Sequence, residues 1–241
     1  MIVEPGSVSR LGAALSNPAR VAMCLALLDG RAWTAGELAR TAGVARSTAS
    51  EHLTTLLEVG LITMRSQGRH AYISLASPDA AHLIEAATAY AGTPAPVTSL
   101  HAAAQRDDLA HARTCYDHLA GVLGVALLDA LTTGGHLSDS LEVTASGRML
   151  FERVTGAAAL EQRGRRPLVR TCLDWTERRP HLSGHLGAEL LRASTRNGWV
   201  VPRAHTRAVS VTAEGWDAFA ALFGVAEVRV PGSRIEPSPA R

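Results

Sequence analysis

Apolar residues recur at helical spacing in the first part of the chain and predict a series of short helices. Between Val8 and Leu15 the apolar side chains stand three or four residues apart, which places them on one face of a helix with 3.6 residues per turn. The same spacing predicts further helices over residues 18–28, 37–41, 47–59 and 78–90.

The ends of these helices carry residues that favour helix starts and stops. Asn17 precedes Pro18, which is the order expected for an N-cap followed by the first helical residue. Thr34 and Glu37 have the spacing of a capping box. Gly60 follows the helix predicted over 47–59 and is expected to end it.

Two strands follow that helix. Residues 61–65 and 70–75 read as strands, and residues 66–69 join them, with Gly68 expected to supply a positive φ in the turn. Residues 42–44 form a tight turn between the two preceding helices. Two helices joined by a glycine-containing turn and followed by a two-stranded wing predict a winged helix-turn-helix, and the fold class is mainly α with small β-hairpins (α+β).

The motifs of this segment resemble those of the ArsR/SmtB family of bacterial transcriptional repressors. The resemblance covers residues 9–91, about a third of the chain, and rests on five phrases in the same order and spacing, at 14–20, 37–39, 47–53, 57–62 and 67–72. It implies binding to double-stranded DNA. It also implies a homodimer, paired through the first and last helices, on an inverted-repeat operator. A winged helix used only for protein contacts is the alternative.

The resemblance assigns DNA contacts to the recognition helix and the wing. Arg46 is expected to pair bidentately with guanine, and a recognition helix presents its N-terminal half to base edges. His52 reaches the DNA backbone or is half-buried beside the wing, and both interpretations remain open. At the wing, phosphate or minor-groove contact is favoured over a solvated hairpin tip. The full set of predicted contacts is Arg46, Ser47, Thr48, Ser50, Glu51, His52, Arg65, Gln67 and Arg69.

The familiar metal sites of the family are missing from this segment. Members that sense arsenic carry cysteines on the helix before the turn, but residues 34–41 contain none. Members that sense zinc carry several ligands on the last helix, where this chain offers only Asp79 and His82, too few for a tetrahedral site. Cys24 occupies an apolar helix position and is expected in the core. Any signal is therefore expected to act elsewhere in the chain.

Proline- and glycine-rich stretches divide the chain. Residues 92–96 and 162–167 read as breaks. We therefore expect a DNA-binding and dimerisation domain over 1–92, two further segments over 97–160 and 167–230, and a frayed tail over 231–241.

These two later segments contain an internal repeat. Residues 115–117 match 172–174, residues 118–124 match 181–187, and residues 143–147 match 211–215. The growing offset places insertions at loops. Each copy is expected to form helix, helix, strand, strand, helix, like the back half of a winged helix. We further expect the two copies, copy 1 (97–160) and copy 2 (167–230), to pack about a pseudo-two-fold axis.

The repeated polar residues suggest an effector site. Cys115 and His118 are three apart and His181 and His185 are four apart, so each pair is expected to share a helix face. An organic effector in a cavity between the copies is the first interpretation. A zinc-like metal site, thiol redox sensing and purely structural roles are the alternatives, and no cofactor is required by the sequence. The candidate effector residues are Cys115, Tyr116, His118, Cys172, Asp174, Trp175, His181 and His185.

Composition and charge narrow the function classes. The chain has 241 residues and a net charge of +2, and all its basic residues are arginine. Because the first 92 residues contain as many acids as arginines, a DNA-binding role depends on where the arginines lie. Three cysteines and no long apolar run or leader favour a cytoplasmic protein with free thiols and no membrane span. Glycine-rich nucleotide loops and a G-x-S-x-G motif are absent, so no enzyme is expected. A Cys/His nucleophile pair is the less favoured alternative.

Overall fold

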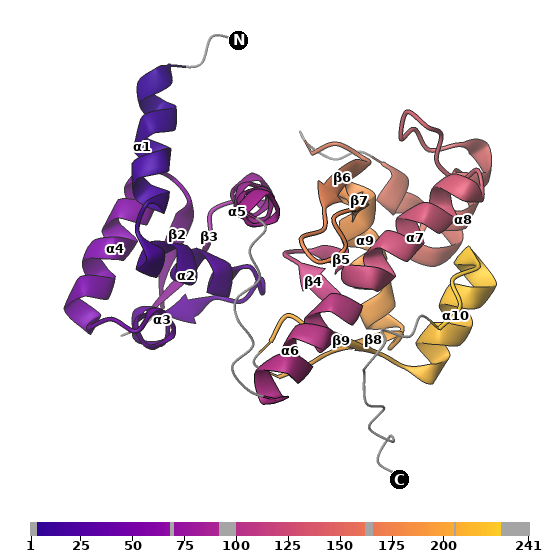
Figure 1. Ribbon diagram of the computed structural model, residues 1–241. Coiled ribbons are helices and arrows are strands. Elements are labelled where there is room, and N and C mark those ends of the chain that lie inside the picture. The colour runs from indigo at the N-terminus through magenta and orange to yellow at the C-terminus, as the bar shows by residue number, and fades with distance from the viewer. Residues whose placement is uncertain (1–3, 68–69, 92–99, 162–165, 205, 228–241) are drawn as a thin grey trace. The chain divides into compact units, whose positions relative to one another are not determined.

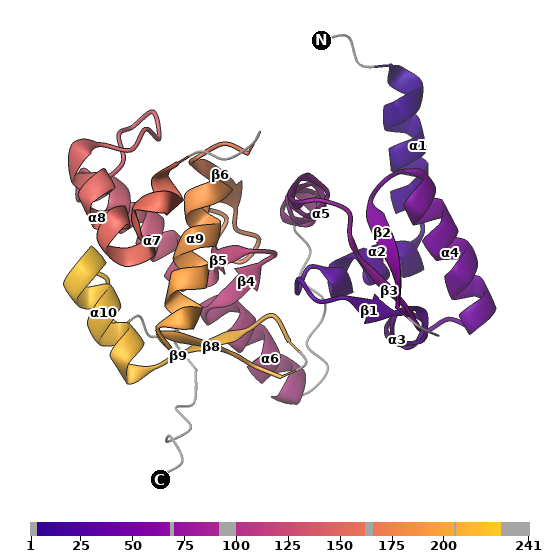
Figure 2. The same ribbon diagram turned by 180° about the vertical axis from the view of Figure 1, so that it is seen from behind.

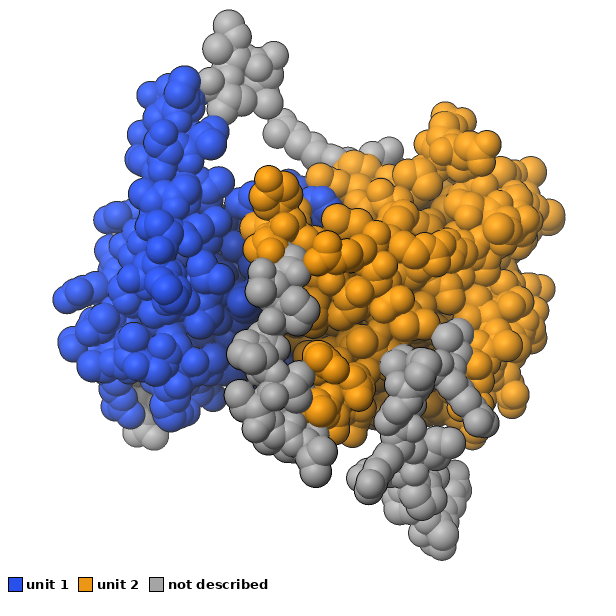
Figure 3. Space-filling model, viewed as in Figure 1, with its two compact units in different colours: residues 1–84 blue, residues 85–241 orange. Residues whose placement is uncertain are grey.

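The computed structural model describes residues 4–67, 70–91, 100–161, 166–204 and 206–227. The chain forms two compact units, unit 1 over residues 1–84 and unit 2 over residues 85–241 (Figure 3). Helices dominate both units, and the strands form small antiparallel sheets, which confirms the α+β fold class. No helix among the described residues is long and apolar enough to cross a membrane.

Unit 1 begins with four helices whose positions agree with the sequence prediction. They are α1 (Pro5–Leu15), α2 (Pro18–Leu27), α3 (Ala35–Ala42) and α4 (Arg46–Glu58) (Figure 1). The predicted N-cap of α2 is confirmed, because Asn17 Oδ1 accepts hydrogen bonds from the backbone N–H groups of Ala19 at 2.9 Å and Arg20 at 3.3 Å. These two bonds satisfy donors that a helix N-terminus leaves unpaired.

The capping box of α3 is also confirmed. The Thr34 hydroxyl accepts from the backbone N–H of Glu37 at 3.3 Å, and the Glu37 carboxylate accepts from the backbone N–H of Thr34 at 2.7 Å. Gly43 ends the helix with a φ of 67°, a left-handed conformation that glycine adopts without strain. The turn that follows leads directly into α4.

The wing is a three-stranded sheet. Strands β2 (Ile62–Gln67) and β3 (His70–Leu75) pair antiparallel, as the sequence predicted. A two-residue strand, β1 (Trp33–Thr34), adds to the far side of β3 and was not predicted. Residues 68 and 69, where Gly68 was expected to take a positive φ, lie outside the described residues, as do most of the expected breaks and the tail (92–99, 162–165 and 228–241).

Helix α5 (Pro78–Ala91) follows the wing and confirms the predicted helix at 78–90. Its first residues belong to unit 1, and its remainder, from Glu85, belongs to unit 2. Helix α6 (Leu100–His111) then leads into the repeated part of the chain.

The matched part of each copy opens with a short β-hairpin where a helix was predicted, and in copy 1 the helix α6 precedes that hairpin. Copy 1 contains β4 (Arg113–Cys115), β5 (His118–Ala120), α7 (Gly121–Thr133), α8 (Ala145–Thr155) and the short 3-10 helix η1 (Ala157–Leu160). Copy 2 contains β6 (Arg170–Leu173), β7 (Pro180–Ser183), α9 (Gly184–Arg196), β8 (Val200–Pro202), β9 (Val209–Val211) and α10 (Ala213–Phe223). The strand pair predicted before the last helix forms fully only in copy 2, as β8 and β9, since copy 1 has a single bridge between Leu137 and Val143 there.

The two copies pack on each other reciprocally. Helix α7 of copy 1 contacts β7 of copy 2, while α9 of copy 2 contacts β5 of copy 1. The two hairpins lie side by side in both views (Figures 1 and 2). Leucines of both copies fill one shared core, among them Leu119, Leu123, Leu127, Leu182, Leu186 and Leu190.

The Val-Thr-Ala-x-Gly motif of each copy has a steric explanation. The threonine caps the last helix, since Thr144 Oγ1 accepts from Gly147 N at 3.1 Å and Thr212 Oγ1 accepts from Gly215 N at 2.9 Å. A Cβ on Gly147 would lie 2.0 Å from a backbone oxygen, and one on Gly215 would lie 2.1 Å from another. Only glycine fits where the helix passes so close to the preceding backbone.

Candidate functional site

Helix α4 presents a polar N-terminal half to solvent. Arg46, Ser47, Ser50 and Glu51 are exposed, while Thr48 and His52 are half-buried. The opposite face of the helix buries Ala49, Leu53 and Leu56 in the core of unit 1. Burial of that apolar face fixes the helix on the unit and leaves the predicted base-reading side chains free to meet DNA.

The wing carries two of its three predicted contacts in the described residues. Arg65 and Gln67 are exposed on β2 and point to the same side of the strand, because side chains alternate along it. Arg69 lies outside the described residues.

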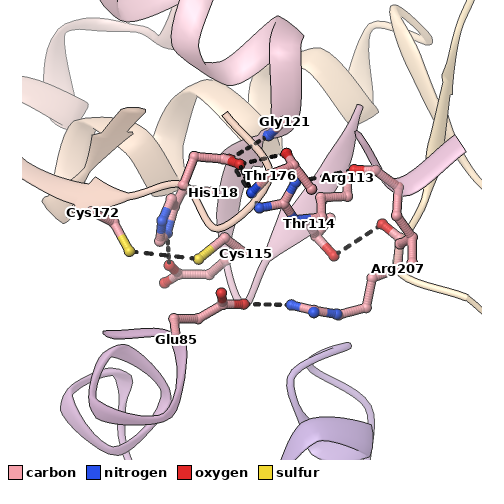
Figure 4. Close-up of polar contacts among 12 residues, drawn as sticks. Glu85, Arg113, Thr114, Cys115, His118, Gly121, Cys172, Thr176 and Arg207 are labelled. Carbon is pink, nitrogen blue, oxygen red and sulfur yellow. Dashed lines mark hydrogen bonds and ion pairs between the residues drawn. The ribbon is translucent and has the colours of Figure 1, made fainter. Parts of the chain in front are cut away.

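Four side chains converge inside unit 2. Cys115, His118, Cys172 and His181 are all buried, and their ligand atoms lie within 4.8 Å of one another. The two Sγ atoms are 3.8 Å apart, and the two imidazole Nε2 atoms are 3.1 Å apart. Figure 4 shows the two thiols facing each other from opposite hairpins. The structure thus gathers four of the eight candidate effector residues at one point.

The two hairpins supply these groups in the same way. Cys115 is directly opposite His118 on β4 and β5, and Cys172 is directly opposite His181 on β6 and β7. The expectation that Cys115 and His118 share a helix face was therefore wrong: they meet across a hairpin. The pairing of His181 with His185 was also wrong, because His181 is on β7 while His185 is on α9.

Each histidine of the cluster turns its other ring nitrogen toward an aspartate. His118 Nδ1 lies 3.3 Å from Asp117 Oδ1, and Arg166 Nη2 donates to the same oxygen at 2.9 Å. Burial raises the pKa of Asp117, but the hydrogen bonds from Arg166 and His118 outweigh it and hold the pKa well below its usual range. Asp117 therefore faces His118 as a carboxylate.

The equivalent aspartate in copy 2 is enclosed more completely. Asp174 Oδ2 lies 3.3 Å from His181 Nδ1, although that nitrogen has no hydrogen bond of normal geometry. The same oxygen accepts from Arg113 Nη2 at 2.9 Å and from the backbone N–H of Gly121 at 2.7 Å. Burial raises the pKa of Asp174, but His181 and Arg113 outweigh that effect, so the pKa lies far below its usual range.

The surroundings shift the pKa values of the two thiols in opposite directions. Burial is the main cause that raises the pKa of Cys115 well above its ordinary value. The hydrogen bond from the Cys115 thiol, followed by those from the two histidines, lowers the pKa of Cys172. Burial opposes the charged form of His181, yet Asp174 and Cys172 raise its pKa. Contact with Cys115 and with the two histidines therefore favours the thiolate form of Cys172, and the thiolate is the form that binds metals.

The other candidate effector residues lie around the cluster and not in it. Tyr116 occupies the β4–β5 turn with a φ of 59°. The ring of Trp175 lies under the guanidinium of Arg113, with the carbon at its centre 4.8 Å from the ring centroid. His185 Nε2 lies 3.7 Å from Glu189 Oε1. Cys24 is buried in unit 1, where burial raises its pKa to about 11, as expected for a core thiol.

Sequence reasoning missed the arginines that hold the aspartates. Arg113 and Arg166 reach Asp174 and Asp117 from positions 61 and 49 residues away in the chain. No local spacing links such distant partners. The repeated Asp of the Cys-x-Asp phrase was a usable signal, since both copies place it beside a cluster histidine.

A second polar connection runs from the Cys115 hairpin to helix α5. Thr114 N donates to the backbone oxygen of Arg207 at 2.9 Å, and the Arg207 guanidinium forms an ion pair with Glu85. Glu85 is almost fully buried. Figure 4 shows this chain of contacts beside the thiol pair.

Comparison with known proteins finds similar transcriptional regulators, one of which aligns with both units. A family described as a helix-turn-helix domain matches residues 15–65. The chain is 40% identical over 216 residues to an uncharacterized HTH-type transcriptional regulator, YdfF, of Bacillus subtilis, which covers 88% of this chain and 95% of that protein. It is 39% identical over 74 residues to the HTH-type transcriptional regulator CmtR of Mycobacterium tuberculosis, covering 31% of this chain and 62% of CmtR.

Similar solved structures cover about a third of this chain. The homodimeric winged helix-turn-helix DNA-binding domain of Mycobacterium bovis, described as a possible ArsR-family regulator, shares 30% identity with a TM-score of 0.34 and covers 36% of this chain and 79% of that one. The family assignment rests on the match to YdfF, which spans both units. From that match and the helix-turn-helix segment, the chain belongs to the HTH-type transcriptional regulators and carries an N-terminal DNA-binding domain of the ArsR type.

Proposed function

We propose that the protein is a cytoplasmic transcriptional repressor that binds an inverted-repeat operator as a homodimer and responds to an effector sensed in unit 2. The observation that carries this proposal is the 40% identity to an HTH-type regulator over 88% of the chain. Because the similarity extends over both units, we infer that unit 2 has a use beyond DNA binding.

The surface of α4 supports operator recognition. Arg46 stands at the first position of the helix and is exposed, so its planar guanidinium is free to bond two acceptors of guanine. Exposed hydroxyls beside it suit bases or phosphates. With no overall excess of positive charge in this segment, affinity depends on these few placed groups and on the arginines of the wing.

Exposed apolar side chains on α1 and α5 support the homodimer. Val8 of α1 is 59% exposed and Tyr90 of α5 is 93% exposed. Large apolar groups on the two helices that the family resemblance assigns to dimerisation favour burial against a second copy.

The Cys/His cluster is the sensory site that the geometry favours within unit 2. Buried leucines of both copies belong to one shared core, which gives little support to an organic effector between the copies. The cluster instead combines buried soft donors with paired charges. We infer that unit 2 senses a signal and does not catalyse a reaction.

Operator binding tests this proposal. DNA selected from a random pool by the purified protein should contain an inverted repeat, and fluorescence anisotropy should give its affinity. Arg46→Ala should cost about 1–3 kcal/mol and relax the preference at one base pair per half-site. Arg192→Ala, which removes an exposed arginine of α9 paired with Glu189, is the matched control and should bind normally. Wild-type affinity in Arg46→Ala would contradict the placement of the recognition helix.

A further inference from the structure

We propose that Cys115, His118, Cys172 and His181 bind one divalent metal ion of the zinc class with tetrahedral coordination, and that this ion is the effector. The binding site follows from unit 2 alone. The role as effector rests on the proposed function above.

The sulfur–sulfur and nitrogen–nitrogen distances fit a tetrahedral ion. With Zn–S bonds of about 2.3 Å, two sulfur ligands of a tetrahedron stand about 3.8 Å apart, and two nitrogen ligands at about 2.05 Å stand about 3.3 Å apart. The observed separations are 3.8 Å for the two Sγ atoms and 3.1 Å for the two Nε2 atoms. The two sulfurs are also well beyond bonding distance, and both cysteines are free.

The orientation of the histidines fits as well. Both rings turn Nδ1 toward an aspartate and Nε2 toward the cluster. A carboxylate that holds the Nδ1–H leaves the Nε2 lone pair free for a metal, and zinc-binding histidines usually donate their other N–H to such a carboxylate. Asp117 and Asp174 are themselves fixed by Arg166 and Arg113, so the rings are held for coordination.

An ion also resolves the charge of the buried cluster. The two Nε2 atoms lie within hydrogen-bonding distance at 3.1 Å and the two sulfurs at 3.8 Å, so four atoms that can bind a metal ion are held together away from water. A divalent cation bound to two thiolates and two neutral imidazoles gives a group of no net charge. The cysteine protons that remain are released to solvent as the ion binds.

The full set of four protein ligands points to a closed site. Catalytic zinc sites keep a position open for water or substrate, whereas closed sites stabilise a fold or a conformation. Each copy contributes one cysteine and one histidine, so the ion would bind the two hairpins to each other. Loss of the ion would remove one of the links between β4–β5 and β6–β7.

A contact path leads from this hairpin to the DNA-binding part of the chain. The backbone N–H of Thr114, next to Cys115, donates a hydrogen bond to the backbone oxygen of Arg207. The Arg207 side chain forms an ion pair with the buried Glu85 of α5. Helix α5 continues into unit 1 and is one of the two helices predicted to form the dimer. A shift in the hairpin would thus act on the helix that sets the spacing of the recognition helices.

Cobalt(II) and zinc(II) test the site directly. The full-length protein is stripped of metal with a chelator under reducing conditions and titrated with cobalt(II). The expected result is one cobalt per chain, with the visible absorption of a tetrahedral ion bound to two thiolates, displaced by equimolar zinc. Cys172→Ser and His181→Gln should lose this spectrum, whereas Cys24→Ser, which removes the buried cysteine outside the cluster, should keep it. Absence of the tetrahedral spectrum in the folded wild-type protein would overturn the site.

Operator affinity tests the effector role separately. The zinc-loaded and metal-free proteins should differ at least tenfold in operator affinity, and Cys172→Ser should bind DNA without responding to zinc. Circular dichroism checks that each variant remains folded. Equal affinity with and without zinc, in protein that binds one zinc, would overturn the effector role and leave the site as structural. Failure of both forms to bind any operator would instead refute the proposed function, while the cobalt spectrum would still stand.

Discussion

The guanidinium of Arg113 and the carboxylate of Asp174 form an ion pair at 2.9 Å between the two repeat copies, and neither side chain is exposed to solvent. The same carboxylate bonds the first residue of α7 and faces the ring of His181. One buried pair therefore joins the two copies, fixes the start of a helix and orients a proposed metal ligand.

Removing one partner of this pair should be severe. Arg113→Met leaves the Asp174 charge buried without its main partner, which costs about 3–5 kcal/mol. Chemical denaturation of the metal-free protein, followed by circular dichroism, measures the loss in free energy of unfolding. Arg179→Met is the matched control, because Arg179 pairs with Asp129 in a largely exposed ion pair worth about 0–1 kcal/mol. Equal losses in the two variants would show that the buried pair has no special role.

Asp117→Asn should weaken zinc binding and leave the fold intact. The carboxylate is partly exposed, bonds His118 and Arg166, and is not itself one of the four ligands. Loss of a carboxylate that accepts a hydrogen bond from a metal-binding histidine weakens metal affinity by about 10–100-fold. Competition with a chromophoric chelator gives the affinity, and the control is Asp129→Asn, which changes a partly exposed aspartate of α7 outside the cluster. An unchanged zinc affinity would remove Asp117 from the site.

The repeated glycines should tolerate no side chain. Gly215→Ala would place a Cβ 2.1 Å from the backbone oxygen of Trp199, and such overpacking costs about 1–3 kcal/mol. The control is Gly12→Ala on α1, where nothing lies within 4 Å of an added Cβ. That change should be neutral or raise stability by up to about 1 kcal/mol. Thermal melting compares the stability of both variants with that of the wild type. A Gly215→Ala variant as stable as the wild type would contradict the steric explanation of the motif.

The capping box of α3 should make unit 1 sensitive to acid. Hydrogen bonds from the Thr34 backbone and hydroxyl lower the pKa of Glu37 from 4.5. A carboxyl with a lowered folded-state pKa contributes stability above its unfolded-state pKa and loses it as the pH falls through the folded-state value. Thr34→Ala should cost about 0.5–2 kcal/mol at neutral pH, and the difference from wild type should shrink on acidification below pH 4.5. A difference independent of pH would refute the role of Glu37.

Unit 1 was predictable because its signals are local. Asn17, Thr34 and Gly60 mark helix ends through bonds or conformations within a few residues, and α4 buries an apolar face over about two turns. The short strand β1 was missed, since two residues carry no periodicity.

The hairpins of unit 2 were beyond that kind of reasoning. Cys115 and His118 are three residues apart, which fits one face of a helix as well as two sides of a tight turn. Strands of three or four residues are too short for their hydrophobic pattern to distinguish a hairpin from a helix. The repeat nevertheless identified the equivalent Cys, Asp and His residues, while their convergence depends on packing between segments about 60 residues apart.

The exchange of contacts between the copies, α7 on β7 and α9 on β5, has an evolutionary consequence. Neither copy encloses a complete core of its own, so a single copy would expose its leucines unless it met a second one. Such an arrangement is what remains when the gene of a self-associating protein duplicates and the two products are joined in one polypeptide. The fused halves are then free to diverge in sequence and structure. The copies already differ in this way, because copy 2 forms the hairpin β8–β9 where copy 1 has a single bridge.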